Sequence, residues 1–232
     1  MMKTVFDNYN YDYPELKSLW GFSAYLEEYR LLFDTGSNGR VLLENMKALD
    51  VAIGEIDYLF ISHSHWDHIG GLDSILELNP DMILFVPESL SKHLINDLRQ
   101  LAKEVVIIKD EPQRLFGDLY TTGLLGDEMP EQSLVIDGEK PVVITGCGHF
   151  GIENIVYRAS RIIGKKIYLA VGGFHLMYSS KEEILETISL LKKEGIEFVS
   201  PTHCTGDQAI ALFAESFGDH FIRGGIGARI AI

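Results

Sequence analysis

The feature that most constrains this chain is a run of three histidines and one aspartate within residues 61–71. The run follows an apolar stretch at 58–61, which predicts a buried strand. Side chains at i and i+2 of an extended segment share a side, so His63 and His65 can bind one ion. Asp67 and His68 fall on the next turn and can bind a second. Imidazole with carboxylate is typical of catalytic zinc, manganese or iron, so the sequence predicts a catalytic metal site at a strand end.

Composition limits the kind of partner this protein can have. A length of 232 residues fits one large domain, and we expect a single domain over 1–232. The net charge is −14, from 34 acidic and 20 basic residues, and no cluster of Lys or Arg interrupts it. Such a surface repels nucleic acid and anionic membranes, so we expect neither as a partner. A small anionic molecule bound at a metal site remains compatible with this charge. The oligomeric state stays open.

The first residues, the length of the apolar runs and the cysteine count bear on the cellular compartment of the protein. The first residues show no apolar core of signal-peptide length, and no apolar run approaches a membrane span, so we expect a cytoplasmic protein. Cys147 and Cys204 are too few for a disulfide scaffold. We interpret both as small buried packing residues, with a disulfide or a thiolate ligand as the alternatives.

The order of apolar segments predicts the fold class. We expect strands at 22–26, 31–33, 58–61, 82–86, 105–108, 119–122, 133–136, 141–144, 167–171, 197–200 and 221–222. Helices are expected at 41–49, 72–78, 87–103, up to 163, from the capping box at Ser180 to the stop at Gly195, and at 207–216. Hairpin-rich strands followed by strand-helix units occur in each half. This order predicts an α/β fold, a four-layered αββα sandwich in which two mixed sheets face each other.

Four predicted strand ends carry histidine, namely the 63–68 segment, His149, His175 and His203. They account for six of the eight histidines, and loops beyond strand ends are where sites form in α/β proteins. Asp34 also follows a predicted strand and is either a turn residue or a partner of the metal ligands. His93 lies beside a helical apolar stripe, and we expect it on the surface.

These motifs resemble the metallo-beta-lactamase fold superfamily of metal-dependent hydrolases. His63-x-His65-x-Asp67-His68 is similar to its signature motif, and the resemblance covers essentially the whole chain in the expected order. The matching single residues are Asp34, His149 and His203. Four shorter segments look like the branch named for dihydropterin ribofuranosylaminobenzene phosphate synthase. They are Trp20-Gly21-Phe22-Ser23, Gly146-Cys147-Gly148-His149, Gly172-Gly173-Phe174-His175-Leu176 and Pro201-Thr202-His203-Cys204-Thr205-Gly206.

The resemblance implies a two-metal centre with divided ligands. One ion would be bound by His63, His65 and His149, and the other by Asp67, His68 and His203. The superfamily usually adds an aspartate that bridges both ions, at the strand end where this chain has residues 172–175 and no carboxylate. Either His175 serves there as a ligand or substrate contact, or solvent alone bridges the ions.

The chemistry implied is hydrolysis by a metal-bound hydroxide, with two divalent ions, zinc first and manganese or iron as alternatives. We assign Asp34, Asp67 and His175 to the reaction, with Asp34 orienting the ligand loop and His175, or alternatively His203, donating to a leaving oxygen. Helices begin after His149 and His203, so free N–H groups there can bind an anion, or the glycines only permit tight turns. Candidate substrate contacts are Trp20, Trp66, Gly151, Thr205 and Gly206.

The leading interpretation is a dinuclear metal-dependent hydrolase acting on a small phosphorylated or otherwise anionic substrate. One alternative is a synthase that joins a dihydropterin diphosphate to ribofuranosylaminobenzene phosphate with release of diphosphate. A second is a redox di-iron site, which the absence of a flavin-binding segment disfavours. A third is a non-catalytic, metal-dependent ligand sensor.

Overall fold

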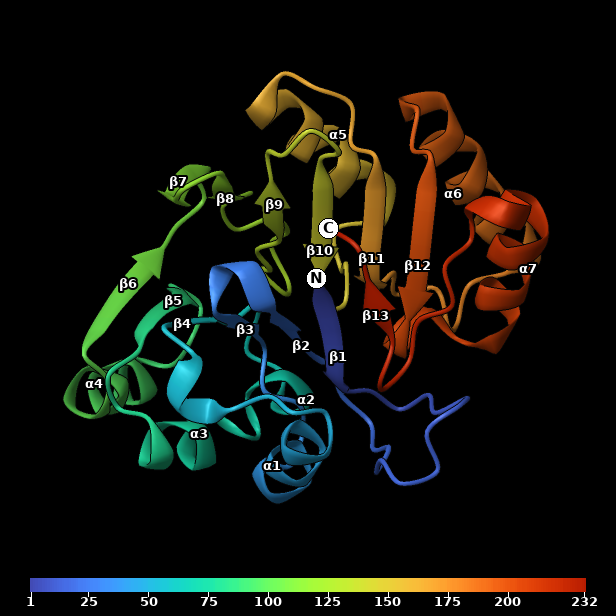
Figure 1. The fold of residues 1–232 in the computed structure, drawn as a ribbon. Coiled ribbons are helices and arrows are strands. Elements are labelled where there is room, and N and C mark those ends of the chain that lie inside the picture. Colours follow the sequence, from blue (N-terminus) through green and yellow to red (C-terminus); the bar gives the residue numbers. More distant parts are fainter. The chain divides into compact units, whose positions relative to one another are not determined.

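A computed structural model describes residues 1–232, and the chain divides into two compact units. Unit 1 comprises residues 1–109 and 225–231, and unit 2 comprises 110–224 with residue 232. Each unit is built on one mixed β-sheet with its own helices (Figure 1). Unit 1 is therefore discontinuous in sequence, because the C-terminal segment returns to it.

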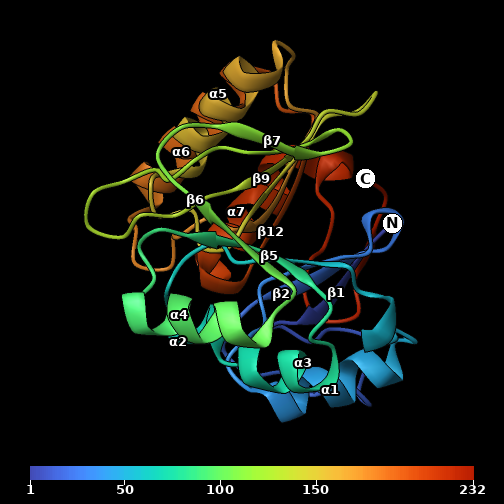
Figure 2. The ribbon, with the colours of Figure 1, turned by 90° about the vertical axis from the view of Figure 1, so that its left-hand side faces the viewer.

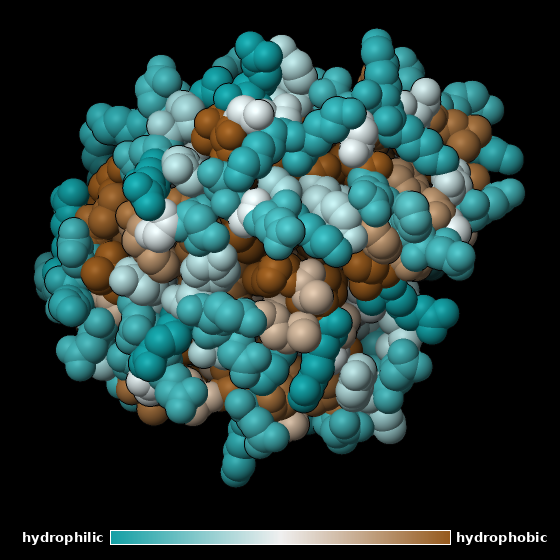
Figure 3. Space-filling view, turned by 45° about the horizontal axis from the view of Figure 1, so that its top comes forward, coloured by the Kyte–Doolittle hydropathy of each residue, from teal (hydrophilic) through white to brown (hydrophobic).

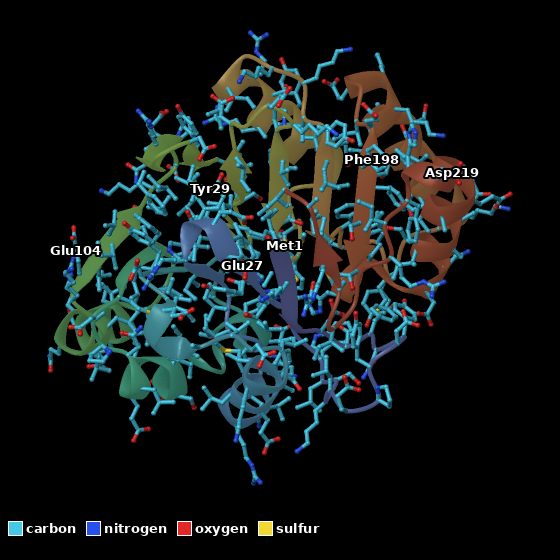
Figure 4. All side chains as sticks on the ribbon, viewed as in Figure 1. Met1, Glu27, Tyr29, Glu104, Phe198 and Asp219 are labelled. Carbon is cyan, nitrogen blue, oxygen red and sulfur yellow. The ribbon has the colours of Figure 1, made fainter.

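The sheet of unit 1 has seven strands in the order β13-β1-β2-β3-β4-β5-β6. Their bounds are β1 Met2–Phe6, β2 Ser23–Leu26, β3 Leu31–Phe33, β4 Tyr58–Phe60, β5 Ile83–Pro87, β6 Glu104–Ile108 and β13 Arg229–Ile230. Strand β1 pairs antiparallel with β13 and β2, and β2 pairs antiparallel with β3. Strands β3 to β6 are parallel. The backbone N–H of Glu27 also donates to the carbonyl of Met1, and Figure 4 labels both residues.

Helices pack along one face of this sheet (Figure 2). They are α1 Gly39–Ala48, α2 Trp66–Ile69, α3 Leu72–Leu78 and α4 Lys92–Leu101, with 3-10 turns η1 Glu27–Tyr29 and η2 Ile53–Glu55. Side chains of Asn38 and Ser91 accept from the first turns of α1 and α4 and fix where these helices begin. Apolar side chains from the strands, such as Leu59, pack against helix residues such as Met46 and form a buried core.

The sheet of unit 2 has six strands in the order β12-β11-β10-β9-β8-β7. Their bounds are β7 Gln113–Phe116, β8 Leu119–Thr121, β9 Leu134–Ile136, β10 Val142–Thr145, β11 Leu169–Gly173 and β12 Phe198–Thr202. Strands β7 to β10 form an antiparallel meander, and β10 to β12 are parallel. Both sheets thus pass from antiparallel hairpins to parallel strand-helix units, which is the repeated order that the sequence predicts.

Three helices cover one face of the second sheet: α5 Ile152–Ile163, α6 Lys181–Glu194 and α7 Asp207–Phe217, joined by η3 His203–Thr205 and η4 Gly218–His220. The predicted capping box is present, since Ser180 and Glu183 satisfy each other's backbone N–H groups. The helix ends at Gly195, which adopts the left-handed conformation with φ 84°. Buried apolar residues such as Ile155, Ile188 and Phe213 pack against this sheet.

Several local predictions were wrong. No strand forms at 221–222, where Phe221 makes only an isolated bridge to Val199, and the last strand is instead β13. Strands β1 and β7 were missed. The helix expected at 87–103 starts only at Lys92, because Pro87 extends β5 and Ser91 caps the helix. Two-residue strands and a strand beside the chain terminus carry too little periodicity to be recognised from sequence.

Polar side chains dominate the molecular face in Figure 3, with smaller apolar patches among them. This agrees with the excess of acidic residues in the sequence. None of the helices combines the length and the apolar character needed to cross a membrane.

Candidate metal centre

The loop after β4 brings His63 and His65 together in unit 1. Nε2 of His63 lies 3.0 Å from Nδ1 of His65, so these two nitrogens converge on one point. Nδ1 of His63 lies 2.9 Å from Oγ of Ser62, whose hydroxyl donates to Asp34. Because that hydroxyl hydrogen is used by Asp34, the serine oxygen is free to accept from Nδ1 of His63. This arrangement places the proton of His63 on Nδ1 and the lone pair on Nε2.

Asp67 and His68 lie on the short helix α2, one turn further along the chain. Oδ2 of Asp67 is 3.7 Å from Nε2 of His68, and the ring centroids of His63 and His68 are 4.2 Å apart. The structure therefore gathers all four donors predicted for this segment within unit 1. Asp67 and His68 are buried, so the carboxylate of Asp67 and the imidazole of His68 are shielded from bulk water.

Asp34 holds this loop in place. Its buried carboxylate accepts from the backbone N–H of Ser62 at 2.7 Å, from the Ser62 hydroxyl at 2.7 Å, and from Nδ1 of His68 at 2.7 Å. The hydrogen bond predicted between Asp34 and the ligand loop is thus present. Since a carboxylate only accepts, Nδ1 of His68 carries the proton and Nε2 keeps its lone pair for a metal. Asp34 itself has φ 54°, an uncommon conformation for a residue other than glycine.

Close backbone contacts fix the other side of the loop. Both the N–H and the hydroxyl of Thr35 donate to the carbonyl of His68, at 2.7 and 3.0 Å. A Cβ atom on Gly70 would lie 2.5 Å from the carbonyl oxygen of Ser37. The glycine after the histidine motif therefore permits an approach that any side chain would block. We call Asp34, Ser62, His63, His65, Asp67 and His68 the unit 1 cluster.

In unit 2, His149 is held by Glu131, a residue that the sequence did not single out. Oε2 of Glu131 accepts from Nδ1 of His149 at 2.7 Å and from its backbone N–H at 3.0 Å. Oε1 accepts from three further backbone N–H groups, those of Gly146, Cys147 and Gly148, at 3.1, 2.8 and 3.0 Å. One buried carboxylate thus accepts from four consecutive backbone N–H groups and fixes the His149 tautomer with the proton on Nδ1.

The other two predicted histidines of unit 2 sit on strained backbone. His175 has φ 51° and follows β11, and His203 has φ 52° and follows β12. The rings of His149 and His175 have centroids 4.5 Å apart. His203 is fully buried, and its Nε2 lies 3.5 Å from Sγ of Cys147. Non-glycine residues in this region cost free energy and cluster at functional sites.

The cysteines lie among these histidines rather than in the apolar core. Both are buried and neither forms a disulfide, and Sγ of Cys204 donates to the carbonyl of Cys147 at 3.3 Å. Burial opposes ionisation of Cys204, but hydrogen bonds with Cys147 and His175 outweigh it and hold the pKa of Cys204 well below its ordinary value. The same hydrogen bond with Cys204 raises the pKa of His175. We call Glu131, Cys147, His149, His175, His203 and Cys204 the unit 2 cluster.

A pocket of about 460 Å³ opens beside His149 and His175 within unit 2. Its walls combine apolar and acidic side chains, and the lining residues are Gly126, Asp127, Glu128, Met129, His149, Phe150 and His175. The sequence did not predict this pocket, because no local pattern links the 126–129 loop to the segment after β10. A flat molecule that donates hydrogen bonds would match an aromatic wall flanked by carboxylates.

The predicted substrate contacts have mixed outcomes. The N–H of Gly151 donates to the carbonyl of Gly148 at 2.9 Å, so the prediction of a free N–H at Gly151 is wrong. The buried Thr205 hydroxyl donates to Thr202 and accepts from Phe174, which ties the ends of β11 and β12 together. A Cβ atom on Gly206 would lie 2.7 Å from Cα of Met177, which explains the glycine as a packing requirement.

The two tryptophans predicted as substrate contacts are exposed, and the two remaining histidines lie outside the clusters. Trp20 and Trp66 are 38% and 62% exposed on unit 1, which leaves them accessible as predicted contacts. His93 is exposed on α4, as expected from its position beside the apolar stripe. His220 stacks on Phe198, labelled in Figure 4, with ring centroids 4.7 Å apart. Neither His93 nor His220 belongs to the two clusters.

The donor chemistry of both clusters fits divalent metal ions. Each cluster contains histidines whose Nδ1 donates to a buried carboxylate, and this contact is typical of metal-ligating histidine because it fixes the tautomer and raises ligand basicity. The clusters also lie beyond the C-terminal ends of parallel strands, where α/β sheets place their ligands.

Comparison with known proteins agrees with this geometry. The family model of the metallo-beta-lactamase superfamily matches residues 23–203. A protein of Methanocaldococcus jannaschii named 7,8-dihydropterin-6-methyl-4-(beta-D-ribofuranosyl)-aminobenzene-5'-phosphate synthase is 32% identical over 240 residues, covering 84% of this chain and 81% of that protein. The chain therefore belongs to the metallo-beta-lactamase superfamily.

Two solved structures show the same fold at lower identity. Tm1679, described as a metal-dependent hydrolase of the beta-lactamase superfamily, has a TM-score of 0.82 at 24% identity, covering 100% of this chain and 98% of that one. The metallo-beta-lactamase fold protein YhfI from Bacillus subtilis has a TM-score of 0.69 at 16% identity, covering 98% and 96%. The predicted fold class, with two mixed sheets and helices, is confirmed.

Proposed function

We propose that this protein is a dinuclear metal-dependent hydrolase acting on a small, phosphorylated or otherwise anionic molecule. Membership of the metallo-beta-lactamase superfamily supports metal-dependent chemistry. The observation that carries the proposal is the pair of contacts in which Asp34 holds Nδ1 of His68 and Glu131 holds Nδ1 of His149. In two separate segments, a buried carboxylate accepts from Nδ1 of a histidine and so fixes the orientation of its Nε2. A histidine with a purely structural role does not require this contact.

The proposed ligand sets are those that the resemblance to the superfamily implies. His63, His65 and His149 would bind one ion, and Asp67, His68 and His203 the other. Zinc is the first candidate, with manganese or iron as alternatives, because imidazole and carboxylate suit all three. When bound, such a pair polarises a phosphoryl or carbonyl oxygen and lowers the pKa of a water molecule.

The protein's own side chains have distinct tasks in this proposal. Asp34 fixes His68 directly and His63 through the Ser62 hydroxyl, so one carboxylate orients two ligands. His175 lines the pocket beside His149 and is placed to contact the substrate or donate a proton to a leaving oxygen. The apolar wall of Met129 and Phe150 would exclude water from the non-reacting part of the substrate.

The test is hydrolysis of a panel of phosphomonoesters, phosphodiesters and lactones by the metal-loaded protein. We expect turnover of at least one phosphorylated class, loss of that turnover in His65→Ala, and unchanged turnover in His93→Ala, whose side chain is exposed on α4. Full activity of His65→Ala would contradict the proposal. Metal binding without turnover of any substrate would instead indicate a sensor.

The second candidate is a synthase that joins a dihydropterin diphosphate to ribofuranosylaminobenzene phosphate and releases diphosphate. It is favoured by the name of the 32% identical relative and by the pocket, whose Phe150 and nearby Asp127 and Glu128 suit a flat, hydrogen-bond-donating ring. Diphosphate release from the pterin diphosphate distinguishes the two. Release without the aminobenzene partner supports a hydrolase, and release that requires the partner supports the synthase. A cytoplasmic location and the lack of nucleic-acid or membrane partners stay predictions.

A further inference from the structure

Cys147, His175 and Cys204 form a second group of donors within unit 2. Their ligand atoms, two thiol sulfurs and one imidazole nitrogen, all lie within 4.8 Å of one another. The three residues follow β10, β11 and β12, which are adjacent parallel strands. None of the three is needed for the two ligand sets proposed above. Their convergence therefore calls for a separate explanation.

Packing does not explain this arrangement. A Cβ atom on Gly173 would lie 2.6 Å from Sγ of Cys204 and 2.5 Å from the carbonyl oxygen of Gly146. The Cys204 thiol thus occupies the space that a side chain at the end of β11 would need. His175 completes the group from a left-handed backbone conformation, φ 51°, which is unfavourable for a non-glycine residue. Apolar packing alone requires neither a glycine beside the Cys204 thiol nor a histidine in the left-handed conformation.

We propose that Cys147, Cys204 and His175 form a binding site for a thiophilic divalent ion of the zinc type. Two thiolates and one imidazole are a ligand set used for catalytic zinc, in which the fourth position stays open to water or substrate. Binding releases the two thiol protons, so the two thiolate charges balance the divalent ion. His175 lies on the side of the pocket, so the open position faces the molecule held there.

The site adjoins the histidine ligands of unit 2 but does not rest on the proposed hydrolase function. Sγ of Cys147 is 3.5 Å from Nε2 of His203, so an ion held by the thiolates would lie next to that imidazole. A soft ligand set at this point would select zinc or cadmium over manganese or magnesium, which prefer oxygen donors. The unit 1 cluster contains no sulfur and has no such preference.

The experiment is cobalt(II) or cadmium(II) titration of the full-length, reduced, metal-free protein. Thiolate ligation gives an intense sulfur-to-metal charge-transfer band in the near ultraviolet, whereas imidazole and carboxylate ligands do not. We expect this band in the unaltered protein, its loss in Cys204→Ser, and its weakening in Cys147→Ser and His175→Ala. The matched control is His93→Ala, whose side chain is exposed on α4 outside both clusters and which should keep the band. Circular dichroism of each variant verifies that it is folded.

Three results would overturn the site. The first is absence of the band from the folded, reduced protein, and the second is a band that persists in Cys204→Ser. The third is a disulfide between Cys147 and Cys204 in protein isolated without oxidant, if the same protein takes up no metal after reduction. The outcome is independent of turnover. A band without hydrolysis contradicts only the hydrolase, and hydrolysis without a band contradicts only the thiolate site.

Discussion

The two units differ in how their donor side chains are distributed along the sequence. In unit 1, four donors lie within residues 63–68, and the carboxylate of Asp34 at the adjacent strand end orients two of them, His68 directly and His63 through Ser62. In unit 2, each strand end supplies one histidine, and Glu131 must gather a whole loop through four backbone N–H groups. Both arrangements end with a buried carboxylate on Nδ1 of a histidine. A ligand set can therefore be concentrated in one turn or distributed over a sheet edge, provided that a carboxylate orients it.

The difference has a structural cost. Unit 2 places His175 and His203 at positive φ and needs Gly173 where β10 and β11 approach, while in the unit 1 cluster only Asp34 has positive φ. The proposed ligands of unit 2 follow three different strands, so we expect unit 2 to be more sensitive to backbone changes than unit 1. The predictions below compare the two units on this basis.

The largest effects are expected from the ligands themselves. His65→Ala in unit 1 and His149→Ala in unit 2 should each lower turnover by more than about a hundredfold, the upper end of what removing a partner of a ligand costs. Steady-state kinetics at saturating metal measure this, with His93→Ala as the control. A loss confined to one of the two variants would mean that only one unit contributes ligands.

Next come the two carboxylates, compared as Asp34→Asn and Glu131→Gln. Each substitution puts an amide where a carboxylate accepted several hydrogen bonds, and each should weaken metal binding by about 10–100-fold. Glu131→Gln should also lower the melting temperature more, because one amide oxygen cannot accept from all four backbone N–H groups that now share two oxygens, and a buried N–H that loses its acceptor costs about 1–3 kcal/mol.

Metal titration and thermal unfolding separate these two effects. Glu139→Gln, an exposed position in the same unit, serves as the control and should change neither. Equal melting temperatures for Asp34→Asn and Glu131→Gln would show that the four N–H contacts do not make unit 2 more dependent on its carboxylate.

Smaller effects are expected from the glycines that permit close backbone approach. Gly70→Ala and Gly173→Ala each place a Cβ atom 2.5 Å from a carbonyl oxygen, so each should destabilise the fold by about 1–3 kcal/mol. Gly54→Ala has no atom within 4 Å of the new Cβ and should stay within about 0.5 kcal/mol of the unaltered protein. Urea unfolding measures all three, and a destabilised Gly54→Ala would refute the steric explanation.

The smallest effect concerns the cap of α6, whose residues belong to neither cluster. Ser180→Ala should cost about 1 kcal/mol at neutral pH. Hydrogen bonds from the Ser180 backbone and hydroxyl lower the pKa of Glu183. A lowered folded-state pKa stabilises the fold above the ordinary carboxyl pKa, and this contribution is lost as pH falls through the lowered value. The difference between Ser180→Ala and the unaltered protein should therefore shrink in acid, and thermal melts across pH test this.

Sequence reasoning succeeded where signals are local. The contiguous donors of residues 63–68 and the capping box at Ser180 are visible from spacing alone, and the geometry of both agrees with the prediction. Glu131 was missed because its partners lie 15 to 18 residues away, across the turn between β9 and β10. The cysteines were interpreted as packing residues, since only the pairing of β10, β11 and β12 brings Cys147 and Cys204 near His175.

The most direct test of the account is the metal content of the folded protein, determined by elemental analysis after equilibration with zinc. For this test we compare the unaltered chain with His65→Ala and His149→Ala, one ligand from each unit. We predict at least two ions per chain, and fewer ions in each variant. A chain that retains no metal, or variants that keep the full complement, would contradict it.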